Sequence, residues 1–129
     1  MKRLAPALAA FTLLTLGASA ALAHHGLTQE FDVKKLVTLK GVVSKVDWVN
    51  PHIYFVLDVD QGGGKTQKYL VETVPVAFAR KAGVTKEIMM GGGKPIELAA
   101  FPGRTDQSRV FAKIITFSDG RTLQLSGDR

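Results

Sequence analysis

The stretch Lys40–Val59, KGVVSKVDWVNPHIYFVLDV, determines how the rest of the chain is arranged. In its second half, large apolar side chains alternate with other residues, and they are Ile53, Phe55, Leu57 and Val59. This two-residue period predicts a strand with one buried face. Before it, Asn50-Pro51 predicts a turn, because proline fixes its own φ and keeps the preceding residue out of the helical region. The stretch therefore predicts two strands joined by a tight turn.

The first half of the stretch changes the face on which its apolar residues lie. Large apolar side chains lie mainly at odd-numbered positions up to 43 and then at 46 and 48. Such a change within one strand requires a bulge or a sharp bend. Gly41 and the Ser44-Lys45 pair are the two places suited to it. We therefore expect a first strand, residues 33–48, that is long and bent.

The rest of the chain adds further strands and one helix. Glycine-rich residues 61–65 predict a hairpin loop. A short helix begins near Pro75 and ends before Gly83, and residues 84–90 are compatible with a second helical turn. Two-residue alternation and the Asp119-Gly120 hairpin signal predict the later strands. The expected strands are 33–48, 53–60, 67–74, 95–101, 109–117 and 121–125.

This order of elements predicts a mostly β protein, a small five- to six-stranded OB-like Greek-key barrel with one short helix after strand three. Closure into a barrel hides the two unpaired edges that a small antiparallel sheet would expose. A small open sandwich is the alternative, and the order of elements favours the barrel. The residues expected in the core include Phe55, Leu57, Val71, Leu98 and Ile114.

Residues 1–23 have the features of a signal peptide that is removed on export. Lys2 and Arg3 form a short basic start, an apolar run follows, and Ala21-Leu22-Ala23 matches the pattern before a cleavage site. An uncleaved membrane anchor is the alternative, and the small residues near the end favour removal. We therefore expect a periplasmic or secreted protein without stable membrane insertion.

Cleavage after Ala23 would leave 129 − 23 = 106 residues, enough for one domain with one core. We expect this single barrel domain at 24–129, with an N-terminal arm, residues 24–32, that docks through Leu27 and Phe31. The chain has no cysteine, which excludes disulfides and lipid attachment through a thiol.

Composition and motifs argue against nucleic-acid binding and against catalysis. Without the two basic leader residues, 17 − 2 = 15 basic residues face 11 acidic ones, and they are scattered rather than clustered as a nucleic-acid surface requires. The glycine run before Lys65 lacks the earlier glycine of a phosphate-binding loop and precedes a strand, which indicates a hairpin. With neither a thiol nucleophile nor a hydrolase serine motif, we expect that the protein is not an enzyme.

The three histidines, His24, His25 and His52, are the candidate metal ligands. After cleavage, His24 carries the free α-amine, which forms a two-nitrogen chelate with its imidazole. A third nitrogen from His25 or His52 would complete a site suited to Cu(II), which prefers nitrogen ligands in a tetragonal arrangement. Asp47, Glu30 or Asp32 could add an oxygen ligand, and Asp47 is a weak candidate. The alternative is that His24-His25 is a disordered end and His52 a turn residue.

Trp48, Asn50 and Tyr54 are candidates for a surface that binds a ligand or partner, because aromatic residues outside OB barrels often stack on ligands. Alternatively, Trp48 closes one end of the core. The first functional hypothesis is a non-enzymatic periplasmic binding module for an unknown small ligand or a metal ion, with copper as the candidate. The second is a structural or protein-interaction domain of the cell envelope that holds no metal.

Several motifs together resemble a family of small exported bacterial proteins that is known only as a domain of unknown function. Its pattern combines a signal peptide, a His-His start, a Lys-Gly strand and an Asn-Pro-His turn. The chain departs from that pattern at Gly26-Leu27, where Ser-Phe is usual, and at the glycine-rich residues 89–94. The resemblance implies no activity, but it favours a site shared by the His-His start and the turn. The matching segments are Ala23-His24-His25-Gly26, Glu30-Phe31-Asp32, Leu39-Lys40-Gly41-Val42-Val43, Val46-Asp47-Trp48-Val49-Asn50-Pro51-His52 and Asp119-Gly120-Arg121.

Overall fold

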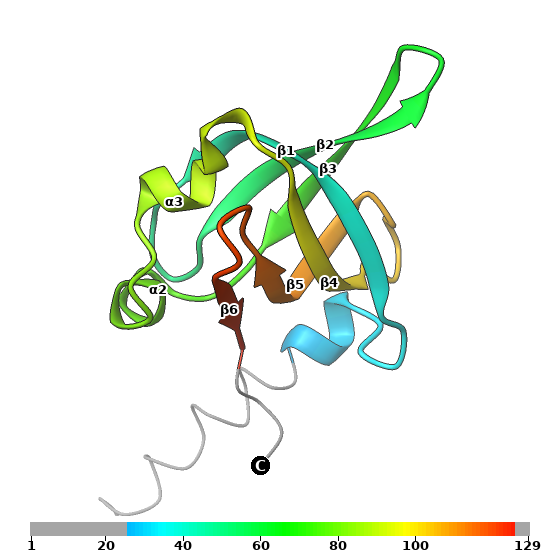
Figure 1. The fold of residues 1–129 in the computed structure, drawn as a ribbon. Coiled ribbons are helices and arrows are strands. Elements are labelled where there is room, and N and C mark those ends of the chain that lie inside the picture. The colour runs from blue at the N-terminus through cyan, green and yellow to red at the C-terminus, as the bar shows by residue number, and fades with distance from the viewer. Residues whose placement is uncertain (1–25, 126–129) are drawn as a thin grey trace, which may run out of the picture.

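Five strands form a closed barrel, and a sixth short strand extends it, in a computed structural model that describes residues 26–125 (Figure 1). The sheet order is β3-β2-β1-β4-β5-β6, and a parallel pairing of β3 with β5 closes the barrel. The predicted OB-like Greek-key barrel is therefore confirmed. The strands are β1 (Val37–Asp47), β2 (Tyr54–Gly62), β3 (Lys65–Glu72), β4 (Ile96–Pro102), β5 (Arg109–Thr116) and β6 (Thr122–Gln124).

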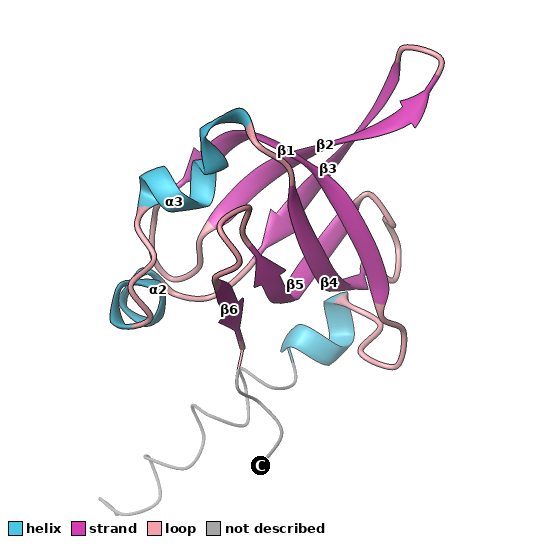
Figure 2. Ribbon diagram, viewed as in Figure 1, coloured by secondary structure: helices cyan, strands magenta, loops and turns pink. Residues whose placement is uncertain are grey.

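The helices lie outside the barrel wall (Figure 2). As predicted, helix α2 (Val76–Lys81) follows the third strand, and Pro75 precedes its first residue. Helix α3 (Lys86–Met90) forms the second helical turn, where the Thr85 hydroxyl oxygen accepts a hydrogen bond from the Ile88 amide. A 3₁₀ turn, η1 (Gly91–Gly93), then leads to β4. Residues 26–30 form a separate helical turn before β1.

Strand β1 bends because it pairs with two different partners. Its first part, Val37–Gly41, pairs with β4, and the part from Val42 onward pairs with β2. The register shift lies between Val43 and Lys45, so the bulge occurs at the second of the two predicted places. The strand starts at Val37 and not at residue 33, because residues 33–36 contain a turn.

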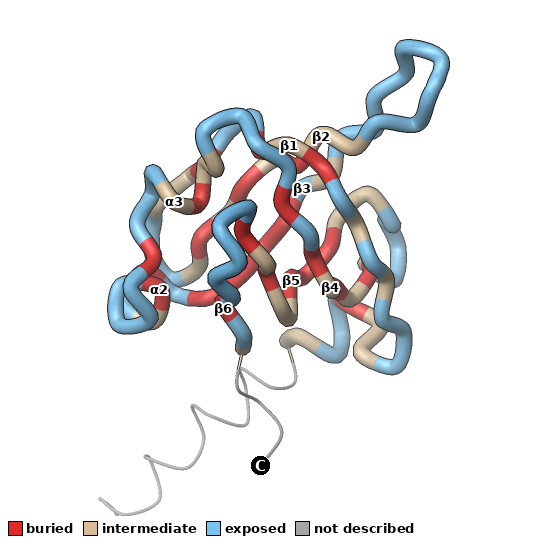
Figure 3. Tube along the Cα trace, viewed as in Figure 1, coloured by how far each residue is buried: buried red, intermediate tan, exposed pale blue. Residues whose placement is uncertain are grey.

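The core lies inside the barrel, where buried segments of all the strands face one another (Figure 3). Four of the five expected core residues are at most 1% exposed, and they are Phe55, Leu57, Val71 and Leu98. The prediction was wrong for Ile114, which is only partly buried, whereas Ile115 is fully buried. Ala99 pairs with Ile114 and Ala100 pairs with Ala112, which leaves Lys113 as an extra residue. This bulge reverses the inward and outward faces of the second half of β5.

The helical turn at residues 26–30 docks on the barrel through the aromatic residue that follows it. Phe31 is 2% exposed, and its ring lies 5.7 Å from that of Phe111 on β5. The backbone adds a bridge between Phe31 and Gly103 and a hydrogen bond from the Asp32 amide to the Pro102 carbonyl. Leu27, the other expected anchor, is half-buried. Across residues 26–125, the longest apolar helix is too short to cross a membrane.

Candidate functional site

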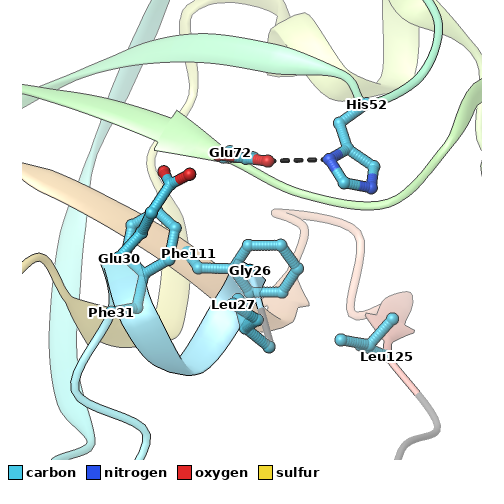
Figure 4. Close-up of a pocket in the computed structure, with 8 residues that line it drawn as sticks. All are labelled: Gly26, Leu27, Glu30, Phe31, His52, Glu72, Phe111 and Leu125. Carbon is cyan, nitrogen blue, oxygen red and sulfur yellow. Dashed lines mark hydrogen bonds and ion pairs between the residues drawn. The ribbon is translucent and has the colours of Figure 1, made fainter. Parts of the chain in front are cut away.

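A pocket of about 380 Å³ opens between the helical turn at residues 26–30 and the barrel wall (Figure 4). It brings together segments that are far apart in the sequence, namely the start of the described chain, the turn before β2, the end of β3, the middle of β5 and the end of the described chain. Its lining residues are Gly26, Leu27, Glu30, Phe31, His52, Glu72, Phe111 and Leu125.

The strongest polar contact in this pocket joins His52 to Glu72. Nδ1 of His52 lies 2.7 Å from Oε1 of Glu72, whose side chain is only 10% exposed. Because the carboxylate also accepts a hydrogen bond from Arg109, it is the acceptor here and Nδ1 carries the hydrogen. A neutral imidazole with its hydrogen on Nδ1 has its free lone pair on Nε2. Figure 4 shows this second nitrogen turned away from Glu72, on the side where Leu125 lies across the pocket.

Arg109, at the start of β5, holds the two carboxylates of the pocket together. Its Nη2 lies 2.9 Å from Oε2 of Glu30 and 3.3 Å from Oε2 of Glu72. Its guanidinium also lies over the ring of Phe31, 5.5 Å from the ring centroid. Through these contacts one side chain links the helical turn at residues 26–30 to β3, and it fixes the carboxylate that orients His52.

Tyr54 belongs to the same polar network. It pairs with Glu72 across β2 and β3, which brings its hydroxyl under the influence of the Glu72 carboxylate. Burial raises the pKa of the Tyr54 hydroxyl, and its interaction with the negatively charged Glu72 raises it further. Tyr54 is half-buried, so part of the side chain that was expected to face a partner supports Glu72 instead.

The other residues predicted from the sequence lie apart from this pocket. Trp48 is half-buried and packs against the core, which is the alternative considered for it. Asn50 is exposed in the turn, where the Asn50-Pro51 peptide bond is cis. The Asp47 carboxylate lies 3.3 Å from the ammonium group of Lys45. Of the predicted ligands among residues 26–125, the pocket is lined by His52 and by Glu30, one of the possible oxygen donors.

His24 and His25 lie outside the described residues. Gly26, which is joined to His25 by one peptide bond, lines the pocket that contains His52. Within residues 26–125, there is no group of three or more histidine and acidic side chains that could hold a metal ion. A metal bound at His52 would therefore need further ligands from outside this part of the chain.

The sequence did not reveal Glu72, Arg109 or Phe111 as site residues. The signal for Glu72 was present, because it is the one charged residue in the mostly apolar run from Leu70 to Val74. A charge in such a run is buried only when it is paired. Its partners come from the turn before β2 and from β5, and sequence spacing alone does not show that these segments meet.

Comparison with models of protein families gives a match over most of the chain. The model of a family described as a family of unknown function (DUF6152) matches residues 12–111, most of the chain. No curated protein matches the sequence.

Proposed function

The chain thus belongs to a family of unknown function, as the resemblance predicted, and we propose from its pocket that it is an exported, non-enzymatic binding module for Cu(II). The site consists of Nε2 of His52 together with nitrogens of His24 and His25. The proposal rests above all on one observation, the 2.7 Å contact between Nδ1 of His52 and the buried Glu72 carboxylate.

This contact matches what metal-binding histidines require. A histidine that ligates a metal through one ring nitrogen usually donates the hydrogen of the other to a carboxylate or carbonyl, which fixes the tautomer and the ring orientation. Glu72 has this role for His52, and Arg109 holds Glu72 in place at 3.3 Å. The ring is therefore already oriented, with Nε2 as the available donor.

The remaining ligands are within reach along the chain. Two residues of extended backbone span at most about 7 Å, and His24 is two residues before Gly26, which lines the pocket. The α-amine of His24, its imidazole and Nε2 of His52 give three nitrogens, a set that suits Cu(II). This α-amine exists only if the leader is removed after Ala23, so the proposed site depends on export.

The composition of the pocket supports binding rather than covalent catalysis. A histidine paired with a carboxylate also occurs beside catalytic nucleophiles. The eight residues that line this pocket include no serine, threonine or cysteine. His52 therefore has no nucleophile to activate among the lining residues.

An envelope-interaction domain without a metal is the second candidate. Strand β3 pairs with β5 only from Leu70 to Glu72, so its earlier residues present a free edge next to Leu70, which is 43% exposed. A free edge can accept an extended segment of a partner protein as an added strand. This reading predicts no gain in copper affinity over a free peptide.

Competitive Cu(II) titration tests the proposal. The processed protein is compared with a form that carries an extra N-terminal Met, with His52→Ala, and with a synthetic peptide of residues 24–32. The Met extension and His52→Ala should each lower the affinity by more than about tenfold, or about 1.4 kcal/mol. Asn50→Ala, in the same turn but apart from the pocket, is the matched control and should bind as the wild type does.

Equal affinities of protein and peptide would overturn the metal site. The intact mass of the secreted protein would show independently whether His24 is its first residue. A first residue other than His24 would exclude the α-amine as a ligand.

A further inference from the structure

We propose that the pocket also binds a small aromatic amine, with the ring on its apolar wall and the ammonium group between His52 and Glu30. This proposal needs neither the metal nor the N-terminal histidines. It therefore goes beyond the copper site and can be tested independently of it. It follows from the volume, the wall and the charge of the pocket.

The volume exceeds what an ion needs. About 380 Å³ lies within the range of roughly 300–1,000 Å³ typical of small-molecule sites. A bicyclic aromatic compound with a short side chain has a size that such a pocket can enclose. The pocket is thus large enough for an organic ligand.

The wall is mostly apolar and partly aromatic. Phe111 is 5% exposed, so it forms part of the floor, and the half-buried Leu27 and Leu125 border it. The His52 ring stands edge-on to Phe111 at 6.5 Å between centroids. Flat rings pack well in such surroundings, in offset or edge-on arrangements. This part of the pocket therefore suits the apolar body of an aromatic ligand.

The polar side of the pocket selects for a hydrogen-bond donor with positive charge. Because Nδ1 of His52 faces the Glu72 carboxylate, Nε2 is the ring nitrogen placed to accept a hydrogen bond from a ligand. Glu30, whose side chain is 52% exposed, keeps its carboxylate at the rim. Two carboxylates, Glu30 and Glu72, face one guanidinium, that of Arg109, so this group carries a net charge of −1. An ammonium group supplies both the donors and the opposite charge.

Calorimetric titration with three indole compounds tests this inference. The protein is the Met-extended form in the presence of EDTA, which removes the copper chelate and alters none of the eight lining residues. Tryptamine should bind. Tryptophol should bind about fivefold more weakly than tryptamine, because its hydroxyl makes only neutral hydrogen bonds. Indole-3-acetate should bind more than about tenfold more weakly than tryptamine, because the negative charge of the pocket repels its carboxylate.

Two variants locate the binding site. Leu125→Trp fills the pocket and should abolish tryptamine binding, whereas Glu30→Gln keeps the shape and should reduce the preference for tryptamine over tryptophol. Val49→Ala, at an exposed residue that does not line the pocket, is the control. Unchanged thermal unfolding of each variant shows that the fold is retained.

Three results would overturn the inference, namely no binding of tryptamine to the parent protein, equal binding of the three compounds, or unchanged tryptamine binding in Leu125→Trp. Because copper is absent throughout, none of these results bears on the metal site. Failure of the copper titration leaves the amine prediction unaffected for the same reason.

Discussion

Arg109 contacts both carboxylates that border the pocket, so its substitution should destabilise both of the segments that carry them. Arg109→Leu removes one of the two side chains that pair with the Glu72 carboxylate among residues 26–125, and it leaves this 10% exposed side chain paired with His52. Because Arg109 itself is 40% exposed, we expect a loss of about 1–3 kcal/mol in unfolding free energy, measured by urea denaturation. Adding Glu72→Leu should restore part of it, since an apolar pair leaves no buried charge uncompensated. A single variant as stable as the wild type would contradict this account of Glu72.

Phe55 gives the corresponding prediction for the core. It is 1% exposed and points into the barrel from β2. Phe55→Ala should lower the unfolding free energy by about 3–5 kcal/mol, because the substitution removes buried apolar surface and leaves a cavity. Val49→Ala, at a residue that is 49% exposed, should change it by less than about 0.5 kcal/mol. A loss below about 1 kcal/mol for Phe55→Ala would be incompatible with its place in the core.

At the scale of elements, the β5–β6 hairpin should respond to acid through Asp119. Its carboxylate accepts hydrogen bonds from the Arg121 amide at 3.0 Å and from Nε of Arg121 at 2.7 Å. These bonds lower the pKa of Asp119 from its usual 3.8. A lowered folded-state pKa contributes stability above the unfolded value, and this contribution disappears as the pH falls through the folded value.

The substitution Asp119→Asn isolates that charge. The wild type should be more stable than the variant near neutral pH, and the difference should shrink when urea denaturation is repeated at about pH 3. Ser118→Ala, at the neighbouring exposed position, should show no such trend. A difference that stays constant with pH would mean that the Asp119 charge does not stabilise the hairpin.

At the scale of the whole molecule, β1 is the strand on which both halves of the barrel depend. Gly41 is the last residue of β1 that pairs with β4, and the next residue pairs with β2. A Cβ added at Gly41 would overlap the backbone carbonyl oxygen of Asp58. Since this neighbour is backbone, Gly41→Ala should cost about 1–3 kcal/mol or more in thermal or urea unfolding. Gly26→Ala, where nothing lies within 4 Å, is the control, and equal stability of the two variants would contradict this close approach.

The barrel could be predicted because the sequence signals for its strands, helix and turns are local. The alternation of Ile53 to Val59, the helix signals around Pro75 and the hairpin signal at Asp119-Gly120 each depend on a few neighbouring residues. The order of these elements then leaves few ways to hide the sheet edges. The misplacement of Ile114 arose from the bulge at Lys113. Apolar residues occupy both faces of this part of β5, so the sequence does not show where the inward-facing and outward-facing positions exchange.

The site was less predictable because it is assembled from distant segments. His52 was singled out by its chemistry, but its partner Glu72 is 20 residues away and Arg109 is 37 residues beyond Glu72. Side chains this far apart in the sequence meet only once the barrel closes. The copper ligands expected from the sequence remain a prediction, since two of the three lie outside the described residues.

The pocket lies between the two ends of the described chain, with Gly26 on one side and Leu125 on the other. Short elements at the periphery of a fold open more readily than its central strands, because few contacts hold their backbone. A molecule bound between these two residues would contact both the helical turn at residues 26–30 and Leu125 just after β6, so either segment could open only after the molecule had left. Occupancy should therefore slow amide hydrogen exchange first in the helical turn at residues 26–30 and in β6. Amides of the β2–β3 hairpin tip should exchange at the same rate with or without the bound molecule.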